Sequence, residues 1–132
     1  MQQIVYISTS RAERPPLDQI EAILAASRRN NARDGLTGLL IVGGRRFLQV
    51  LEGPAERLDR TYARIKQDPR HFALVELSRR PIAAPSFPEW DMGYEVGDAD
   101  LLPLVAGLTG KVADPSLKAQ LLSFAELHTK AA

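Results

Sequence analysis

Residues 36–52 read Leu-Thr-Gly-Leu-Leu-Ile-Val-Gly-Gly-Arg-Arg-Phe-Leu-Gln-Val-Leu-Glu, and this stretch decides the fold. Two largely apolar runs, 36–42 and 46–52, flank a pair of glycines that is typical of a tight hairpin turn. A carboxamide, Gln49, stands at the centre of the second run. Burying a carboxamide is costly unless its donors and its acceptor find partners. The hairpin is therefore predicted to lie in the core and to direct one polar side chain at a partner or a guest.

Strand and helix patterns on both sides of this hairpin complete an order of βαββαββ. Strands are predicted over 3–8, 36–42, 46–52, 72–78 and 92–96, and helices from Leu17 to about Asn31 and from Pro54 to Asp68. Right-handed crossovers in such a unit put the first strand beside the third, with both helices on one face. The sequence thus predicts an α+β fold, a ferredoxin-like βαββαβ sheet with an added fifth strand. Tyr6 and Gln49 then fall on neighbouring central strands.

The pattern changes after Val96. Apolar residues gather between Leu101 and Leu108, and an amphipathic helix is predicted over 115–130. A ferredoxin-like sheet with helices on one face leaves its other face bare. We therefore expect one domain over residues 1–96 and a C-terminal helical segment, 97–132, that covers the bare face or binds a partner.

The composition excludes several classes of function. The 132 residues, 45% hydrophobic and 25% charged, suit one globular domain with a core. A net charge of +1 gives no case for nucleic acid or an anionic membrane as the main partner. There is no cysteine, which excludes disulfides and thiolate chemistry. No stretch has the apolar length of a membrane span, and the first residues lack the regions of a signal peptide, so the cytoplasm is the expected location.

Six short motifs occur in one order along the chain. They are Ile4-Val5-Tyr6-Ile7-Ser8, Ser27-Arg28-Arg29-Asn30-Asn31-Ala32-Arg33, Gly35-Leu36-Thr37-Gly38-Leu39-Leu40, Phe47-Leu48-Gln49-Val50-Leu51-Glu52-Gly53, Asp68-Pro69-Arg70-His71 and Phe87-Pro88-Glu89-Trp90-Asp91-Met92. With these motifs the chain resembles the BLUF family, the sensors of blue light using FAD, in its short stand-alone form. The resemblance implies a blue-light photoreceptor without enzyme activity of its own, with FAD as cofactor and FMN or riboflavin as possible substitutes.

The resemblance also implies roles for individual residues. Tyr6 matches the tyrosine that donates an electron and then a proton to the excited flavin. Gln49 matches the glutamine between that tyrosine and the flavin, whose hydrogen bonds rearrange on illumination. Asn31 matches the asparagine that binds the pyrimidine edge of the ring system, and Asn30 its polar neighbour.

A second group of residues is expected around these. Ser27, Trp90 and Met92 match positions that surround the glutamine. If their segment is extended, Trp90 and Met92 face the same side, and which of them lies beside Gln49 stays open. Four cations are placed to meet the pyrimidine oxygen, the ribityl chain or the phosphates: Arg64, Lys66, Arg70 and His71.

Each of these residues has an ordinary structural interpretation as well. A buried strand tyrosine usually bonds a backbone carbonyl. Asn30-Asn31 is typical of a helix end followed by a left-handed turn. Trp90 after a proline-rich connection suits a loop anchor, and His71 beside Arg70 a solvated pair. It is the joint occurrence of the motifs that favours the functional interpretation.

Two other functions suit the same topology less well. An acylphosphatase-type enzyme needs glycine-rich backbone donors around a phosphate after the first strand, and residues 8–16 contain no glycine. An RNA-binding module needs aromatic residues on the central strands, where only Tyr6 and Phe47 are available. We therefore expect a sensor that signals to a separate effector protein, whose identity the sequence does not reveal, and that forms a homo-oligomer.

Overall fold

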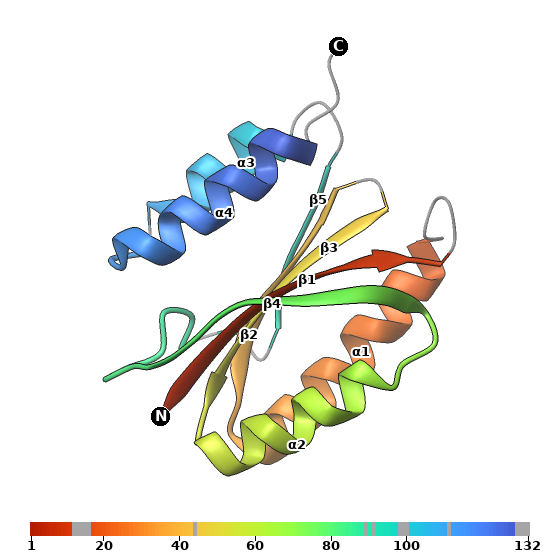
Figure 1. Ribbon diagram of the computed structural model, residues 1–132, viewed down its shortest axis with the longest axis vertical. Coiled ribbons are helices and arrows are strands. Elements are labelled where there is room, and N and C mark those ends of the chain that lie inside the picture. The colour runs from red at the N-terminus through yellow and green to blue at the C-terminus, as the bar shows by residue number, and fades with distance from the viewer. Residues whose placement is uncertain are drawn as a thin grey trace.

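The computed structural model describes residues 1–11, 17–43, 45–88, 90, 92–97, 101–110 and 112–128, with backbone alone at residues 17 and 94–97. Helices lie on both faces of one sheet (Figure 1). The elements are β1 (Gln2–Ser10), α1 (Leu17–Asp34), β2 (Thr37–Gly43), β3 (Arg46–Gly53), α2 (Ala55–Lys66), β4 (His71–Pro81), β5 (Gly93–Gly97), α3 (Leu101–Thr109) and α4 (Pro115–His128). None of the described helices is both long and apolar enough to cross a membrane.

The sheet has the strand order β4-β1-β3-β2-β5. The hairpin β2–β3 is antiparallel, and so are the pairs β1–β3 and β1–β4, whereas β5 runs parallel to β2. This confirms the predicted ferredoxin-like sheet with an added fifth strand. The register between β1 and β3 sets Tyr6 directly opposite Gln49, so one side of the two central strands carries both polar side chains.

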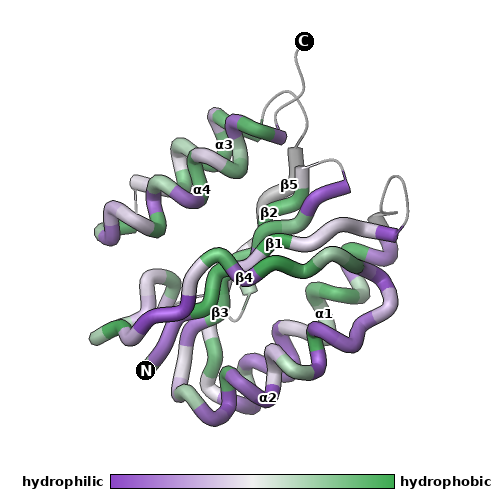
Figure 2. The backbone as a smooth tube through the Cα atoms, in the orientation of Figure 1, coloured by the Kyte–Doolittle hydropathy of each residue, from purple (hydrophilic) through white to green (hydrophobic). Residues whose placement is uncertain are grey.

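The two faces of the sheet form two separate apolar clusters. Alternate residues of the strands point to opposite faces, and α1 and α2 cover the face that carries Tyr6 and Leu51, while α3 and α4 cover the other (Figure 1). Figure 2 shows hydrophobic positions through the centre of the sheet and a largely hydrophobic α3. Leu117 and Leu121 of α4 are completely buried. The expectation that the C-terminal segment covers the bare face is confirmed.

Helix α1 runs further than the sequence predicted. We expected it to end near Asn30 or Asn31, but it continues to Asp34. Gly35 follows with φ 69°, and the Leu36 N–H donates to the Asn31 carbonyl at 2.9 Å. A glycine in the left-handed region is the favoured residue just after a helix, so the helix continues to it. The prolines 15–16 expected at the start of α1 lie outside the described residues.

Strand β4 is also longer than predicted, extending from His71 to Pro81 at the edge of the sheet. Its pairing with β1 shifts register twice, and Ala73 between two paired residues has φ 52°. Such irregularities are common at sheet edges. The shift at Ala73 separates the start of β4, near the pocket described below, from the rest of the strand.

We predict that Leu121→Ala lowers the free energy of unfolding by about 2–5 kcal/mol, because it opens a cavity under α4. Leu127→Ala on the same helix should change it by less than about 0.5 kcal/mol, because Leu127 is 78% exposed. Urea denaturation of both variants measures the difference. Equal effects would mean that α4 does not pack on the sheet in solution.

Candidate functional site

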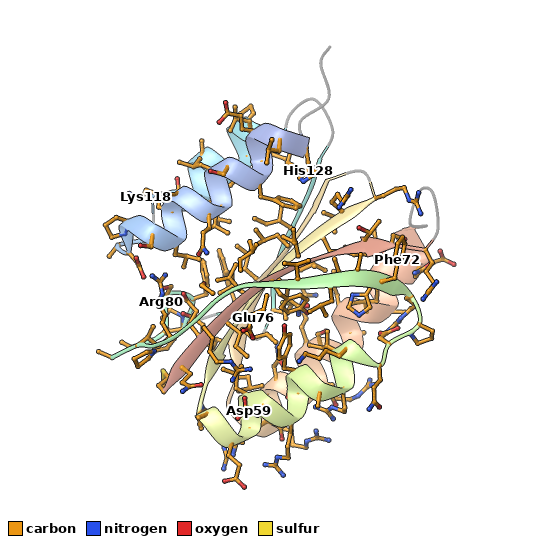
Figure 3. The ribbon with its side chains drawn as sticks, viewed as in Figure 1. Asp59, Phe72, Glu76, Arg80, Lys118 and His128 are labelled. Atoms are coloured by element: carbon orange, nitrogen blue, oxygen red, sulfur yellow. The ribbon has the colours of Figure 1, made fainter. Side chains whose placement is uncertain are left out.

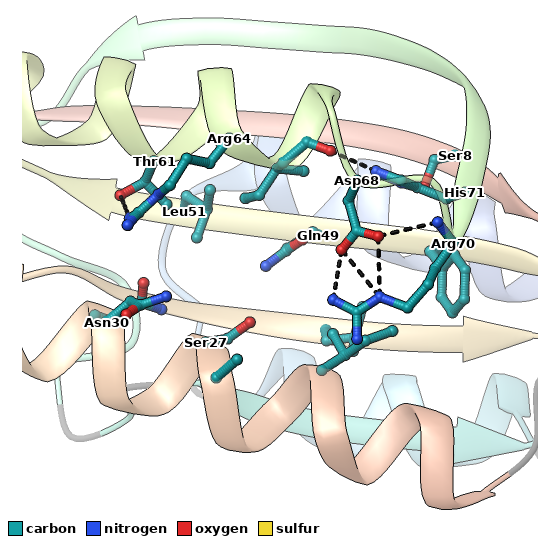
Figure 4. A pocket seen from close by; sticks show the side chains of 16 residues that line it. Ser8, Ser27, Asn30, Gln49, Leu51, Thr61, Arg64, Asp68, Arg70 and His71 are labelled. Carbon is teal, nitrogen blue, oxygen red and sulfur yellow. Dashed lines mark hydrogen bonds and ion pairs between the residues drawn. The ribbon is translucent and has the colours of Figure 1, made fainter.

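A pocket of about 160 Å³ opens between α1 and α2 over strands β2 and β3 (Figure 4). Its walls join apolar side chains with carboxamides, hydroxyls and charged groups. The lining residues are Ser8, Ile23, Ala26, Ser27, Asn30, Asn31, Leu40, Phe47, Gln49, Leu51, Thr61, Arg64, Ile65, Asp68, Arg70 and His71. Gln49 lies at the back of the pocket, with Asn30 and Arg64 toward one end and the Asp68–Arg70 pair at the other (Figure 4).

A chain of three side chains lies behind this pocket. The Tyr6 hydroxyl donates to the Oε1 of Gln49, and the Nε2 of Gln49 donates to the Met92 sulfur at 3.8 Å. Tyr6 is 1% exposed and Gln49 9%. Burial raises the pKa of the Tyr6 phenol well above its ordinary value, and Tyr62 and Asp68 add to this shift. Tyr6 therefore keeps its proton, which the hydrogen bond to Gln49 requires.

Met92 and Trp90 pack in the clusters on opposite faces of the sheet, so the extended segment that would have put them on the same side is not formed. The segment is not extended, since the Trp90 N–H donates to the Phe87 carbonyl at 3.2 Å. The indole stacks on the Phe87 ring, with centroids 5.6 Å apart and planes inclined by 7°, in the cluster under α3 and α4. A side chain at Gly93 would meet this indole at 2.4 Å, so a glycine is needed there. Met92 is the neighbour of Gln49.

Two hydrogen bonds fix the main chain at these two residues. The Gly38 N–H donates to the Trp90 carbonyl at 3.2 Å, and the Nε of Arg28 donates to the Met92 carbonyl at 3.1 Å. The segment is thus held to β2 and to α1 at once.

The polar residues of α1 come together as the sequence predicted. Ser27, Asn30 and Asn31 stand three and four positions apart, a spacing that puts them on one side of a helix, and all three line the pocket. Asn31 is 1% exposed. Of the four basic residues predicted to meet the cofactor, three line the pocket and one does not. Arg64, Arg70 and His71 line the pocket, whereas the Lys66 ammonium lies 4.3 Å from the ring centre of Tyr62 and does not.

The cations that line the pocket all have protein partners. Arg64 donates to the Thr61 hydroxyl at 3.2 Å. Arg70 binds Asp68 through three side-chain contacts of 2.5–3.1 Å. Figure 4 shows this pair at the pocket end where β4 begins.

His71 uses both of its ring nitrogens. Nε2 lies 2.6 Å from the Ile65 carbonyl, and Nδ1 lies 2.8 Å from the Ser8 hydroxyl. Because a carbonyl only accepts, Nε2 carries a hydrogen. His71 therefore ties the start of β4 to β1 and to the end of α2.

Sequence reasoning missed three polar residues of the pocket. Ser8 and Asp68 stand inside the quoted motifs without an assigned role, and Thr61 lies one turn after Leu58 on the inner side of α2. The apolar walls were missed as well: Ile23, Ala26, Leu40, Phe47, Leu51 and Ile65. The helical spacing of Leu58, Thr61 and Ile65 was the available signal.

The donor set suits a flat heteroaromatic ring. Apolar walls would enclose its faces, and the carboxamides of Asn31 and Gln49 would meet polar edges that both donate and accept. The pocket is smaller than the roughly 300–1,000 Å³ that encloses a drug-sized ligand. A dinucleotide would therefore be enclosed only in part. The residues present fit the ring system of a flavin.

Comparison with known proteins decides the family. The family described as "Sensors of blue-light using FAD" matches residues 1–93. The chain belongs to the BLUF family. It is 39% identical over 74 residues to the blue light- and temperature-regulated antirepressor BluF of Escherichia coli K12, which covers 56% of this chain and 18% of BluF. It is 36% identical over 90 residues to the photoactivated adenylate cyclase subunit beta of Euglena longa, which covers 67% of this chain and 10% of that protein.

A solved BLUF structure matches at full length. The dark-state structure of BlrB, a BLUF protein, is 29% identical to this chain with a TM-score of 0.75. The match covers 95% of this chain and 93% of BlrB. The chain is thus a member of a family of blue-light sensors that use a flavin and has the fold of that family. By contrast, it spans less than a fifth of each of the two curated relatives named above.

We predict that Arg70→Gln raises the pKa of Asp68. In the folded protein the Arg70 side-chain hydrogen bond lowers this pKa below its ordinary 3.8. The stability that this shift contributes is present above pH 3.8 and is lost as the pH falls through the lowered value. Carboxyl titration by NMR measures the change.

Arg33→Gln is the matched control for this prediction, because Arg33 lowers the pKa of Asp34 and should leave Asp68 unaffected. An unchanged Asp68 titration in Arg70→Gln would show that the ion pair does not form in solution.

Proposed function

We propose that this chain is a flavin-dependent blue-light switch in which Tyr6 and Gln49 are the photoactive pair and Ser27, Trp90 and Met92 its surroundings. The observation that carries the proposal is the hydrogen-bonded series from the Tyr6 hydroxyl through the Gln49 amide to the Met92 sulfur. It lies at the back of a pocket with flavin-compatible walls. Family membership supports the flavin and the response to light.

The ring system would lie between α1 and α2. Asn31, with Asn30 beside it, would bind the pyrimidine edge, and Gln49 would face the same ring from β3. Arg64, Arg70 and His71 would meet the pyrimidine oxygen, the ribityl chain or the phosphates. Lys66 would join them only by leaving the Tyr62 ring. FAD is the proposed cofactor, and FMN or riboflavin would fill the enclosed part of the pocket equally, because that part takes only the ring system.

Light absorbed by the flavin supplies the oxidising power when the cofactor is bound. Tyr6 would give an electron and then its hydroxyl proton to the bound flavin, and Gln49, whose Oε1 accepts the Tyr6 hydrogen bond, would lie on the path of that proton. The Gln49 amide can turn by half a rotation within the same space. Its Nε2 would then face Tyr6 and its Oε1 would face Met92. The hydrogen-bonding groups that Gln49 offers to a bound ring would therefore change.

The output would pass through the C-terminal segment. We propose that residues 1–96 are the sensor and 97–132 the cap that a separate effector protein reads, with no enzyme activity in the chain itself. The relatives named above are an antirepressor and a photoactivated adenylate cyclase subunit, so the family occurs with different outputs. We propose that the protein is a cytoplasmic homo-oligomer. The net charge of +1 gives no case for nucleic acid or an anionic membrane as its main partner.

We predict that the purified protein is yellow and shows a reversible red shift of its flavin band in blue light. Tyr6→Phe, Gln49→Leu and Gln49→Glu should keep the flavin and lose the shift, because each removes the donor or the amide. Absorption spectra before and after illumination measure this.

Tyr62→Phe is the matched control, since the Tyr62 ring lies 5.3 Å from that of Tyr6 but its hydroxyl is not bonded to Gln49. It should keep the shift. A colourless protein that takes up no added flavin would contradict the proposed function. A normal red shift in Tyr6→Phe would contradict the proposed role of Tyr6.

We predict that Asn31→Ala weakens flavin binding about five- to hundredfold, because each lost hydrogen bond at a desolvated edge costs roughly 1–3 kcal/mol. Asn30→Ala should have a smaller effect, since Asn30 is less buried than Asn31. Titration of flavin-free protein with FAD gives both affinities. If Asn31→Ala binds as tightly as the wild type, Asn31 serves only the helix end.

A further inference from the structure

Glu52 is a fully buried carboxylate outside the pocket. It follows Gln49 by three residues on β3 and therefore points to the opposite face of the sheet. Its relative exposure is 0%. Three N–H groups donate to it: Nε2 of Gln3 at 2.9 Å and the Ser86 main chain at 2.9 Å, both to Oε2, and the Phe87 main chain at 3.0 Å to Oε1. A buried carboxylate that accepts three hydrogen bonds is held in one defined position.

The charge of Glu52 is balanced through a neighbouring amide. The side-chain oxygen of Gln3, Oε1, accepts from Nε and Nη2 of Arg80 at 3.1 and 3.0 Å. A cation on one side and an anion on the other fix the direction of this amide. Arg80 also binds Asp114 at 2.6 Å, and Asp114 accepts from the Ser116 N–H at the start of α4. Figure 3 shows Arg80 beside the end of α4 that carries Lys118.

The two main-chain groups on Glu52 belong to the segment that carries Trp90 and Met92. Phe87 is bonded to Glu52 through its N–H, to Trp90 through its carbonyl and to the indole through its ring. The hydrogen bond from Phe87 to Glu52 therefore also fixes the main-chain turn that directs Trp90 toward α3 and α4. Met92, two residues on, then reaches Gln49 on the other face.

We propose that Glu52 is a positioning residue for the switch, and that by holding Ser86 and Phe87 it keeps Met92 and not Trp90 against Gln49. Two adjacent N–H groups and a third donor converge there, and a carboxylate is the side chain with two acceptor oxygens and no donor. The inference rests on the proposed roles of Gln49 and Met92. Its test uses flavin-free protein, so a failure of the photochemistry would not be mistaken for a failure of this inference.

The first test is Glu52→Gln. Arg80 keeps the Gln3 amide pointing its NH₂ group at position 52, so the new carbonyl must face Gln3 and Ser86. The new NH₂ group then faces the Phe87 N–H. We expect hydrogen exchange at the Phe87 amide to accelerate at least about tenfold, since a bond to a charged acceptor is lost, while Ser86 changes less. Exposed Glu56 on α2 provides the matched control, and Glu56→Gln should change neither amide.

The double variant Gln3→Glu with Glu52→Gln should reverse this result. The new carboxylate at position 3 keeps Arg80 paired and accepts from the NH₂ group at position 52, whose carbonyl then faces Phe87. Ser86 now loses its acceptor, so its amide should exchange at least about tenfold faster, while Phe87 returns toward the wild-type rate.

Fluorescence of Trp90, the only tryptophan in the chain, reports its position. Acrylamide should quench Trp90 at least about twofold more strongly in Glu52→Gln, because the hydrogen bond that fixes Phe87 in the Phe87–Trp90 stack is lost. Leu121→Ala, which destabilises the same cluster without touching Glu52, should keep wild-type quenching. If Glu52→Gln does not fold, the double variant Gln3→Glu with Glu52→Gln carries the test through its faster Ser86 amide, because it keeps the Arg80 pair.

The proposal would be overturned if the Ser86 and Phe87 amides exchanged at the wild-type rate both in Glu52→Gln and in the double variant. A faster Phe87 amide with unchanged Trp90 quenching would also overturn it, because Glu52 would then hold the main chain without deciding where the indole lies. Equal quenching changes in Glu52→Gln and Leu121→Ala would reduce Glu52 to a general stabilising residue and would also reject it.

Discussion

The structure depends on the need of one buried carboxamide for partners. Gln49 has two donors and an acceptor in the centre of a sheet covered on both faces, where leaving them without partners costs free energy. Its acceptor is met by the Tyr6 hydroxyl and one donor by the Met92 sulfur. The first partner requires the register that sets β1 against β3, and the second requires the chain to return beside β2 as β5. The fold is thus the arrangement that brings three distant segments to one amide.

The two central strands carry a second polar pair on their other face. Gln3 lies opposite Glu52 just as Tyr6 lies opposite Gln49, and a shift of three residues along each strand exchanges the faces. The pocket side holds a neutral pair, a phenol that donates to a carboxamide. The α4 side holds a charged network that ends at Asp114 in front of α4. The same two strands therefore connect the pocket to the C-terminal helices through side chains three residues apart.

Much of this arrangement could be predicted from the sequence, for reasons that are local. Gly43 and the apolar runs around it specify the hairpin, and the strand and helix order specifies the crossovers. Gln49, Asn31 and Ser27 could be assigned to one pocket by pattern and family motif. The face on which Trp90 lies could not be predicted, because the indole packs in a cluster formed with α3 and α4, which lie beyond the local sequence pattern. Asn31 likewise resembled a helix end, and only the left-handed Gly35 shows where α1 stops.

The segment from Phe87 to Met92 is where the two faces meet, and this makes it the best-suited bistable element. Trp90 belongs to the cluster under α3 and α4, and Met92 belongs to the cluster under α1 and α2. Packed clusters resist gradual deformation, so a change in the Gln49 amide is transmitted only if it favours a second discrete packing of this segment. Met92 touches that amide directly, and Trp90 touches the layer beneath the C-terminal helices. In the proposed switch, a shift of one would change the position available to the other, and the rearrangement of a single hydrogen bond would reach the far face through two side chains.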